Sequence, residues 1–420
     1  MTEKNGQSLS MEEKYRLRAT VVLTFTPGKP VSNLDLLAGR EKQIGKVLEA
    51  VFSPGQHAAI YGERGVGKSS LANLIYDMVF ATGKESFIPV RINCSAMISY
   101  HEIWREIFRQ IQLNSARGET MLEDQVSDTP NSEDIRQIFE QASNSSIVVI
   151  DEFDRVDEIT AAAMSDTIKT LSDRDADTTL VLVGVADSVE QLIYEHLSID
   201  RALIQIPMPR MSRDELIAIV TKGMTRLPEL SIEEGLGKRM ADISKGLPHF
   251  THLLAKHSAL SAINDGRRRI VRKDYESALK TATEDKSQTL GQAYLKATHS
   301  ARETIFEEVL LACALATDER GFFGAKDVKR PLARIMNKPV KIEAYIRHLD
   351  KFSQEARGPV LKKGGQKRKF QYSFVEPMMQ PYVLMKALTE GKITEEQLSV
   401  LSNPSSASGA PYEKLTFDAQ

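Results

Sequence analysis

The chain has 420 residues, of which 41% are hydrophobic and 27% charged, and this predicts two or three globular domains. Its formal net charge of −2 favours no class of partner, and its two cysteines exclude a disulfide framework and a cysteine-based zinc site. No apolar segment approaches the length of a membrane span or a signal peptide, so we expect a cytoplasmic protein without a membrane partner.

The first half of the chain alternates predicted strands with predicted helices. Residues 1–20 are polar and predict a flexible or helical tail, and an amphipathic helix is expected within residues 34–52. The predicted strands are His57–Tyr61, Phe87–Asn93, Ser146–Ile150, Thr179–Val185 and Ala202–Ile206, separated by helical patterns such as Ser99–Gln112 and Glu133–Ala142. This alternation predicts an α/β core over residues 21–210, with a parallel sheet covered by helices on both faces.

The second half of the chain is mostly helical in pattern. Residues 211–290 predict a small all-helical domain of three or four helices. Residues 291–392 predict a further domain, which begins with a helical pattern over Ser300–Ala316 and contains a hairpin over Val360–Phe374. The end of the chain, residues 393–420, is rich in Ser, Pro, Gly and Ala from Asn403 onward and predicts a disordered tail.

Residues 62–69 form a complete G-x-x-x-x-G-K-S phosphate-binding loop between a predicted strand and a predicted helix. Its glycines allow the backbone N–H groups to converge on an anion, at the positive end of the helix dipole. Lys68 can reach the β- and γ-phosphates, and the Ser69 hydroxyl can ligate Mg²⁺. The pattern predicts binding of a nucleoside triphosphate by Gly62, Glu63, Arg64, Gly65, Val66, Gly67, Lys68, Ser69 and Ser70.

An acidic pair follows the most apolar strand of the core. The run Ser146–Ile150 is typical of a central parallel strand, and Asp151 and Glu152 come directly after it. Asp151 is placed to hold Mg²⁺, and Glu152 is placed to orient or deprotonate the attacking water. Asp154 and Asp157 are interpreted as ordinary surface acids.

Over about residues 34–385 the chain resembles AAA+ ATPases, in particular their initiator or origin-recognition-like branch. Besides the two motifs above, Leu37–Glu41 resembles the "GRE" box that packs near the adenine in this family. The resemblance implies that the nucleotide is ATP with Mg²⁺. It also implies that residues 211–290 are a helical lid and residues 291–392 a winged-helix domain.

The same resemblance suggests two further residues that sense the nucleotide. Asp187, at the end of Thr179–Ser188, falls at the sensor-1 position, where the family usually has Asn, Ser or Thr, and Ser188 is the alternative. Pro248 and His249 fall where the sensor-2 helix begins, and the initiator branch usually has Arg in place of His249. A carboxylate is repelled by a γ-phosphate and a histidine contact depends on pH, so we expect slow hydrolysis, stimulated by an oligomer or partner.

Arg201 separates this family from a near relative. Ser198–Arg201 resembles the segment that carries the arginine finger, which reaches the γ-phosphate of a neighbouring subunit, and Arg210 is the alternative candidate. STAND-type signalling ATPases share the GRE box and a winged helix, and Lys245–His249 also resembles their lid motif. They usually lack a finger in trans, so an active Arg201 favours the initiator branch and a homo-oligomer.

The C-terminal domain is strongly basic. Residues 322–372 contain fourteen Lys and Arg against four Asp and Glu, whereas the whole chain has a net charge of −2. The run Lys362–Lys369 lies in the predicted hairpin, after a predicted helix over Lys341–Glu355, as the wing of a winged helix would. This predicts binding of double-stranded DNA, although an acidic protein partner would fit the same charge.

The sequence therefore predicts an AAA+ ATPase that binds DNA through a winged helix and oligomerises with ATP. The first alternative is a STAND-like signalling or defence ATPase, whose basic C-terminal domain contacts a protein effector. The second is a weakly catalytic scaffold that binds ATP for structure. Replication, transposition control and phage defence all remain open as processes.

Overall fold

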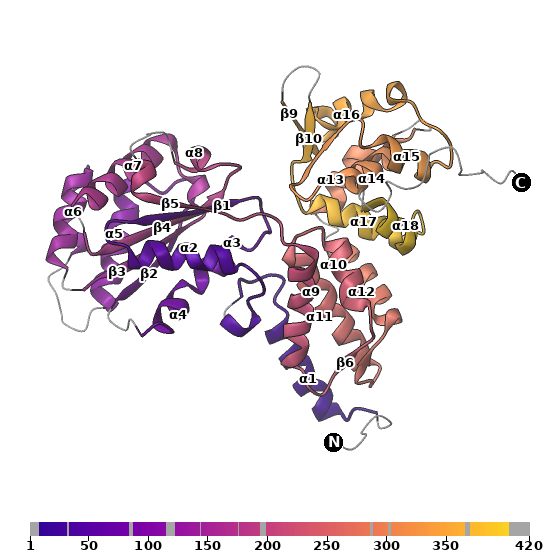
Figure 1. Cartoon of the computed structure of the whole chain (residues 1–420), viewed down its shortest axis with the longest axis horizontal. Helices are drawn as coiled ribbons and strands as arrows, with labels where there is room; N and C mark the ends of the chain where they lie inside the picture. The colour runs from indigo at the N-terminus through magenta and orange to yellow at the C-terminus, as the bar shows by residue number, and fades with distance from the viewer. Residues whose placement is uncertain are drawn as a thin grey trace, which may run out of the picture. The chain divides into compact units, whose positions relative to one another are not determined.

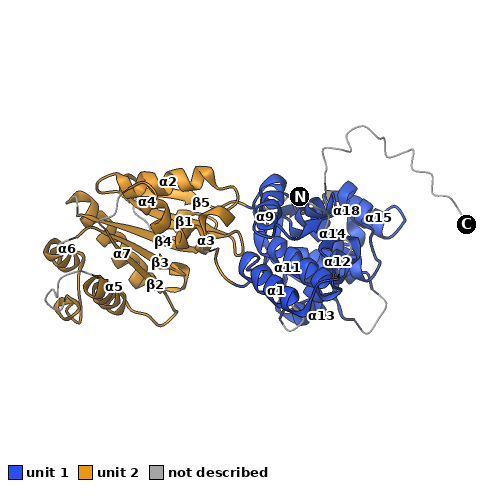
Figure 2. Cartoon of the chain, turned by 90° about the horizontal axis from the view of Figure 1, so that it is seen from below, with its two compact units in different colours: residues 1–28, 210–420 blue, residues 29–209 orange. Residues whose placement is uncertain are grey.

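The computed structural model divides the chain into two compact units (Figure 2). Unit 2 comprises residues 29–209, and unit 1 comprises residues 1–28 and 210–420. The structure describes residues 8–31, 33–83, 87–114, 122–142, 144–174, 176–193, 199–285, 289–300, 304–365 and 370–402. Within these ranges no helix is both long and apolar enough to cross a membrane.

Unit 2 is built on a five-stranded parallel sheet with the order β2-β3-β4-β1-β5 (Figure 1). The strands are β1 (His57–Gly62), β2 (Ile88–Asn93), β3 (Ser146–Asp151), β4 (Thr178–Val185) and β5 (Leu203–Pro207). Each overlaps a predicted strand, and the predicted α/β class is confirmed. The central strands are buried on both faces, which explains their nearly continuous apolar runs.

Helices cover both faces of this sheet (Figure 2). They are α2 (Glu41–Phe52), α3 (Lys68–Asn73), α4 (Ile75–Phe80), α5 (Tyr100–Asn114), α6 (Ser132–Gln141), α7 (Glu158–Asp173) and α8 (Val189–Leu192). Short 3₁₀ turns occur at Leu34–Leu36, Glu123–Gln125, Phe153–Arg155 and Ile199–Arg201.

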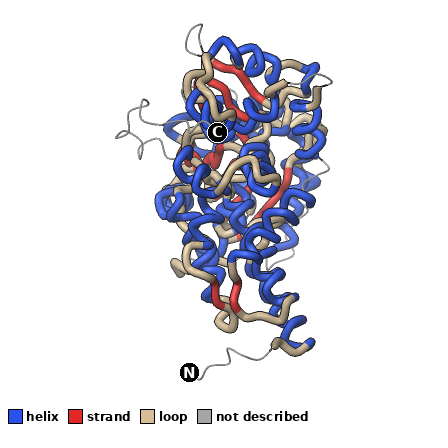
Figure 3. The backbone as a smooth tube through the Cα atoms, turned by 90° about the vertical axis from the view of Figure 1, so that its right-hand side faces the viewer, coloured by secondary structure: helices blue, strands red, loops and turns tan. Residues whose placement is uncertain are grey.

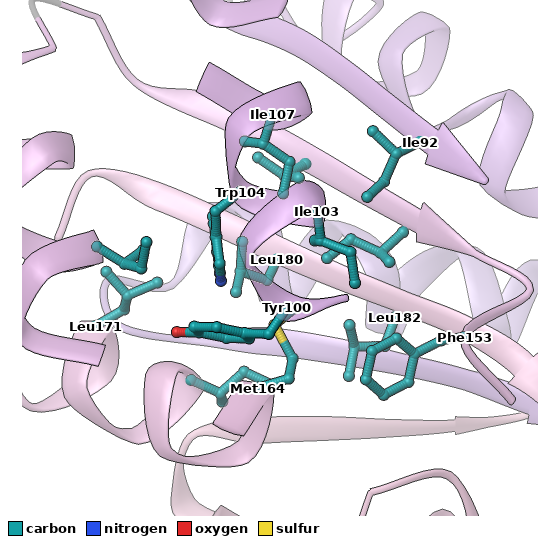
Figure 4. Close-up of a cluster of buried hydrophobic side chains, with 14 of the residues drawn as sticks. Ile92, Tyr100, Ile103, Trp104, Ile107, Phe153, Met164, Leu171, Leu180 and Leu182 are labelled. Atoms are coloured by element: carbon teal, nitrogen blue, oxygen red, sulfur yellow. The ribbon is translucent and has the colours of Figure 1, made fainter. Parts of the chain in front are cut away.

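The core beneath α5 and α7 is centred on a buried tryptophan (Figure 4). Trp104 of α5 is fully buried beside Tyr100, and the cluster includes Leu182 of β4 and Met164 of α7. Replacement of such a side chain by alanine typically costs about 3–5 kcal/mol. This packing holds the strands in a constant register, so that the carboxyl ends of β1, β3 and β4 lie at one edge.

The first part of unit 1 after the sheet is a helical bundle (Figure 3). It consists of α9 (Arg213–Thr225), α10 (Leu236–Ser244), α11 (Pro248–Asn264) and α12 (Arg272–Asp285), with a two-stranded parallel ladder of β6 (Ser231–Ile232) and β7 (Arg269–Ile270). The four helices match the predicted all-helical region, and the two short strands were not predicted.

The C-terminal part of unit 1 combines helices with a three-stranded antiparallel sheet of order β8-β10-β9. In chain order its elements are α13 (Thr289–Thr298), α14 (Phe306–Ala316), β8 (Phe322–Gly324), α15 (Lys329–Ile335), α16 (Ile346–Phe352), β9 (Leu361–Gly364), β10 (Gln371–Phe374), α17 (Met379–Thr389) and α18 (Glu395–Ser402), with 3₁₀ turns at Ile342–Ala344 and Glu355–Arg357. Of these elements, α14 and the hairpin of β9 and β10 match predicted ones, whereas β8 and α15 were not predicted. The single helix expected over Lys341–Glu355 is instead the short α16 between two 3₁₀ turns.

The N-terminal segment is helical, which is one of the two forms expected for the tail over residues 1–20. It contains α1 (Met11–Thr24), which begins with a capping box between Ser10 and Glu13. Leu17 and Val21 are buried one turn apart, and α1 contacts α11 of the same unit. Ion pairs hold this polar segment as well, because Arg16 pairs with Glu229 and Glu13 pairs with Arg268.

The C-terminal tail expected over residues 393–420 also begins with a helix. Leu398 of α18 is only 3% exposed, and Glu395 forms ion pairs with Arg239 and Arg272. Residues 403–420 lie outside the described part of the chain. The predicted domain boundaries near residues 210 and 290 stay predictions.

Candidate functional site

The phosphate loop follows β1 and leads directly into α3. Gly65 and Gly67 have φ angles of 89° and 98°, in the left-handed region that favours glycine. Gly62 has a different requirement, because a Cβ at this position would lie 2.4 Å from the Met208 carbonyl oxygen. Two glycines therefore shape the loop and the third allows close packing against the chain after β5.

Lys68 is the first residue of α3 and is only 8% exposed. Its Nζ donates hydrogen bonds of 2.9 Å to the carbonyl oxygens of Gly62 and Glu63. Burial lowers the pKa of Lys68 to about 8, against the nearby acidic charges, which raise it. A desolvated ammonium group that is held by neutral carbonyls is well suited to receive an anionic ligand.

The other predicted loop residues surround this lysine. Val66 is buried, and its carbonyl accepts a hydrogen bond of 2.8 Å from the buried Arg40 of the predicted GRE box. Arg64 is exposed, and the Ser70 hydroxyl accepts a hydrogen bond from the Val31 amide. Arg40 thus contacts the phosphate loop directly, and the adenine contact that the resemblance implied for the GRE box stays a prediction.

Ser69 and Asp151 meet at the carboxyl edge of the sheet, as predicted. The Ser69 Oγ lies 3.4 Å from Asp151 Oδ1, and Asp151 is 5% exposed. Two hard oxygen donors at this spacing fit Mg²⁺, which usually takes one or two protein ligands and completes its octahedron with phosphates and water. Among the described residues no group of three or more His, Cys, Asp or Glu could hold a metal ion.

Glu152 adopts an unusual backbone conformation at the end of β3. Its φ of 56° and ψ of 32° are left-handed, which costs a non-glycine residue roughly 1–2 kcal/mol. The Glu152 amide donates to Asp151 Oδ1 at 2.9 Å, and its carboxylate accepts a hydrogen bond from Arg155 at 2.7 Å. Strain of this kind is often found at functional sites, and here it turns an exposed carboxylate away from the buried strand.

Arg91 of β2 is a site residue that the sequence analysis missed. Its guanidinium donates to Asp151 Oδ2 at 2.7 Å and to Asn73 Oδ1 at 2.9 Å. No local signal could have identified it, because it lies 60 positions from Asp151 in the chain. The pairing of β2 with β3 brings the two side chains together.

Asp154 is exposed, in keeping with its interpretation as a surface acid, and it also contacts the end of β4. Its Oδ1 accepts a hydrogen bond of 2.8 Å from the Val185 amide at the end of β4. Gly184 lies so close that an added Cβ would be 3.0 Å from the same oxygen. Asp154 also raises the pKa of Lys68 against the effect of burial, so it contributes to the charge balance of the loop.

Asp187 and Arg201 lie at different edges of the sheet. Asp187 is exposed two residues after β4, and its amide donates to Gln191. Because Val185 pairs with Gly62, Asp187 follows a strand end next to the phosphate loop. Arg201 is exposed before β5, at the amino end of a strand parallel to β1, so it lies at the opposite edge of the sheet from the loop of its own chain.

Pro248 and His249 begin α11 in unit 1, and their sensor assignment stays a prediction. The Pro27 carbonyl accepts a hydrogen bond from His249 Nδ1. Arg210, the alternative finger candidate, donates to the carbonyl of Lys245 and to the Gln380 side chain, both of unit 1. These contacts indicate that Arg210 has a structural role within its own unit.

The basic hairpin forms as predicted, from β9 and β10. Lys362 and Lys363 are exposed, and Lys363 Nζ donates to Asp350 at 2.7 Å and lies 4.3 Å from the centre of the Phe370 ring. Lys367, Arg368 and Lys369 lie outside the described residues. Further exposed cations of this domain are Lys326, Lys329, Arg334, Lys338, Lys341, Arg347 and Lys351.

Comparison with protein families identifies the sheet-containing unit. Residues 53–193, which include the phosphate loop, Asp151 and Glu152, match a family model described as an AAA domain. The predicted resemblance to AAA+ ATPases is thereby confirmed for the core. A comparison with curated protein sequences finds no significant match.

Solved structures of low sequence identity are similar along most of the chain. They include Cdc6p from Pyrobaculum aerophilum (15% identity, 89% of this chain and 99% of that chain, TM-score 0.45) and the Aeropyrum pernix ORC2 protein in ADPNP–ADP complexes (14%, 90% and 98%, 0.48). The Aeropyrum pernix ORC1 protein in complex with DNA is a third (13%, 89% and 98%, 0.47). Identities of this size are too low to transfer a function.

Proposed function

We propose that the protein is an ATP-binding and ATP-hydrolysing switch of the initiator type, which binds double-stranded DNA and oligomerises with ATP, because its residues 53–193 match the model of an AAA domain. The observation that carries this proposal is the edge of the sheet where Lys68, Ser69 and Asp151 meet. We expect slow hydrolysis, because Asp187 and His249 replace the residue types usual at the two sensor positions.

Each residue at this edge has a distinct task in the proposed reaction. The loop amides and Lys68 bind the phosphates, and the ammonium group exchanges its two carbonyl partners for phosphate oxygens. Ser69 and Asp151 would hold Mg²⁺, which when bound supplies positive charge to the phosphate oxygens. Glu152 orients the attacking water and accepts its proton, for which the carboxylate must first leave Arg155.

The DNA-binding half of the proposal rests on charge and on element order. Residues 322–372 have a net charge of +10 by the count above, so the remainder of the chain is near −12. The exposed lysines of the hairpin can contact the phosphate backbone, and α16 is the candidate for the major groove. Such contacts would give a DNA affinity that falls steeply with salt.

The position of Arg201 supports an oligomer. This residue lies at the opposite edge of the sheet from its own phosphate loop, so we expect any contact with a γ-phosphate to occur in a neighbouring subunit. Arg201→Ala should then retain ATP binding and lose most hydrolysis. Arg105→Ala, which removes an exposed arginine from α5 of the same unit, is the matched control.

The test combines three measurements on the full chain. ATP hydrolysis is measured with and without a duplex of about two helical turns over a series of salt concentrations, since the salt slope reports phosphate contacts. Sedimentation with ATP and with ADP reports assembly. Stimulation by duplex DNA at low salt, together with ATP-dependent assembly, supports the proposal.

The opposite outcome would favour the STAND-like alternative. A monomer that purifies with bound ADP and binds no duplex at any salt concentration would contradict the DNA-switch proposal. The basic domain would then be a candidate surface for an acidic protein effector.

A further inference from the structure

The contact between Arg91 and Asp151 joins two neighbouring parallel strands beside the phosphate loop. Arg91 pairs with Val149 in the sheet, and Asp151 lies two residues further along β3 on the same face. The arginine side chain therefore reaches its diagonal neighbour, with an N–O distance of 2.7 Å. The side chain of Asp151 is 7% exposed and that of Arg91 is 24% exposed, so water screens this pair only partly.

The two oxygens of Asp151 have different partners. Oδ1 accepts hydrogen bonds from the Ser69 hydroxyl at 3.4 Å and from the Glu152 amide at 2.9 Å. Oδ2 accepts from Arg91, which a further hydrogen bond to Asn73 holds in place. Oδ1 is thus the oxygen next to Ser69, the second candidate metal ligand. Oδ2 is neutralised by the guanidinium group of Arg91, which is always charged.

The guanidinium group has two opposing effects on a divalent cation at this carboxylate. It fixes the side-chain rotamer, which changes an affinity by roughly tenfold at most. It also repels a charge of +2 across the shared carboxylate, and at such short range in a partly buried site this changes an affinity by on the order of a hundredfold or more. The repulsion outweighs the orientation.

We propose that Arg91 is a positioning residue that occupies Asp151 in the nucleotide-free protein and prevents a free divalent cation from binding there before the nucleotide. Ser69 and Asp151 supply two oxygen donors, too few to retain a cation against this repulsion. The phosphates of a nucleotide bring negative charge that offsets the guanidinium. This inference rests on the proposed nucleotide-binding function and adds an order of binding to it.

The experiment measures binding of Mn²⁺ alone, by the loss of its free electron paramagnetic resonance signal, to the full chain without nucleotide. Arg91→Met keeps the length of the side chain and removes its charge, and it should bind Mn²⁺ at least about tenfold more tightly than wild type. Arg91→Lys keeps the charge and loses the planar fork. The Mn²⁺ affinity of Arg91→Lys should stay within about threefold of that of the wild type. A purely structural role for the planar fork would not explain this difference between Arg91→Lys and Arg91→Met.

Two further variants identify the site and guard against misfolding. In the Arg91→Met background, Asp151→Asn should abolish the gain in Mn²⁺ affinity. Arg91→Gln keeps hydrogen-bonding groups for Asp151 and Asn73 without the charge, and it should show the same gain as Arg91→Met. Unchanged Mn²⁺ affinity in a folded Arg91→Gln protein would overturn the proposal.

Binding of ATP, measured separately on the same proteins, distinguishes the two possible failures. Normal ATP binding with no change in Mn²⁺ affinity rejects the role of Arg91 and leaves the nucleotide function intact. Absence of ATP binding by the wild type rejects the nucleotide function, and the order of binding falls with it.

Discussion

Lys68 of the phosphate loop and Lys363 of the basic hairpin are two lysines in opposite surroundings. Lys68 is 8% exposed and donates to two backbone carbonyls, and burial lowers its pKa to about 8. Lys363 is exposed and donates to the Asp350 carboxylate, and this hydrogen bond raises its pKa. The ammonium group of Lys68 is held by neutral oxygens, whereas that of Lys363 already has a carboxylate partner.

The difference predicts two kinds of anion binding. At the phosphate loop, one desolvated cation and a set of fixed amides meet a compact polyphosphate, so a single residue decides the affinity. At the hairpin, several hydrated cations share the contact with an extended backbone, so each contributes a small, salt-sensitive part. Four predictions test this contrast, beginning with the two changes at the phosphate loop and its acidic strand end.

Lys68→Ala should lower ATP affinity by on the order of a hundredfold or more, because it removes a charge-assisted partner of the β- and γ-phosphates. Isothermal titration measures the decrease. Lys46→Ala, which removes an exposed lysine of α2 in the same unit, should leave the affinity unchanged. Equal ATP affinities for Lys68→Ala and wild type would contradict the assignment of the loop.

Glu152→Gln should lower single-turnover hydrolysis by about 10²-fold to 10⁴-fold and leave ATP bound, because the amide keeps the size of the side chain and loses the base. The matched control is Glu158→Gln, at the exposed start of α7. Hydrolysis at the wild-type rate in Glu152→Gln would exclude this carboxylate as the catalytic base.

Replacement of the hairpin cations by alanine should weaken duplex binding for all sequences alike. The substituted residues are Lys362, Lys363, Lys367, Arg368 and Lys369. The slope of log affinity against log salt should become shallower by about one unit for each DNA phosphate that no longer meets a cation. Lys273→Ala with Lys280→Ala, on exposed positions of α12, serves as the control. An unchanged slope would show that the hairpin does not bind phosphates.

The smallest effect concerns pH. The pKa of Lys68 is lowered to about 8 in the nucleotide-free protein, so its ammonium form is lost as the pH rises above that value. ATP affinity should then fall by up to about tenfold per pH unit. The nucleotide-free fold should gain stability over the same range, because the cost of burying the charge is present below pH 8 and disappears as the lysine deprotonates.

An effect of His249 on ATP affinity can be distinguished from that of Lys68. If His249 contacts the γ-phosphate, ATP affinity should already fall near neutral pH, and His249→Arg should remove that step only. A flat affinity up to about pH 9 would contradict the proposed state of Lys68.

Short-range patterns made most of the core predictable. The phosphate loop lies within residues 62–69, and Asp151 and Glu152 end one apolar strand, so strand, turn and helix signals placed them correctly. The hairpin of β9 and β10 was equally local. The N-terminal tail stayed open between a flexible and a helical form, because Leu17 and Val21 form a stripe too narrow to decide the structure of a polar segment.

The sequence by itself determined which residues form the phosphate loop, the acidic strand end and the basic domain, because each is a local pattern with its own chemistry. Only the tertiary structure decided what surrounds them. Arg91 reaches Asp151 through the pairing of β2 with β3, and Arg210 reaches Gln380 across 170 positions of the chain. Such pairings depend on strand register and helix packing, which arise from many weak apolar interactions along the whole chain. The local sequence around each of the two residues therefore does not indicate its partner.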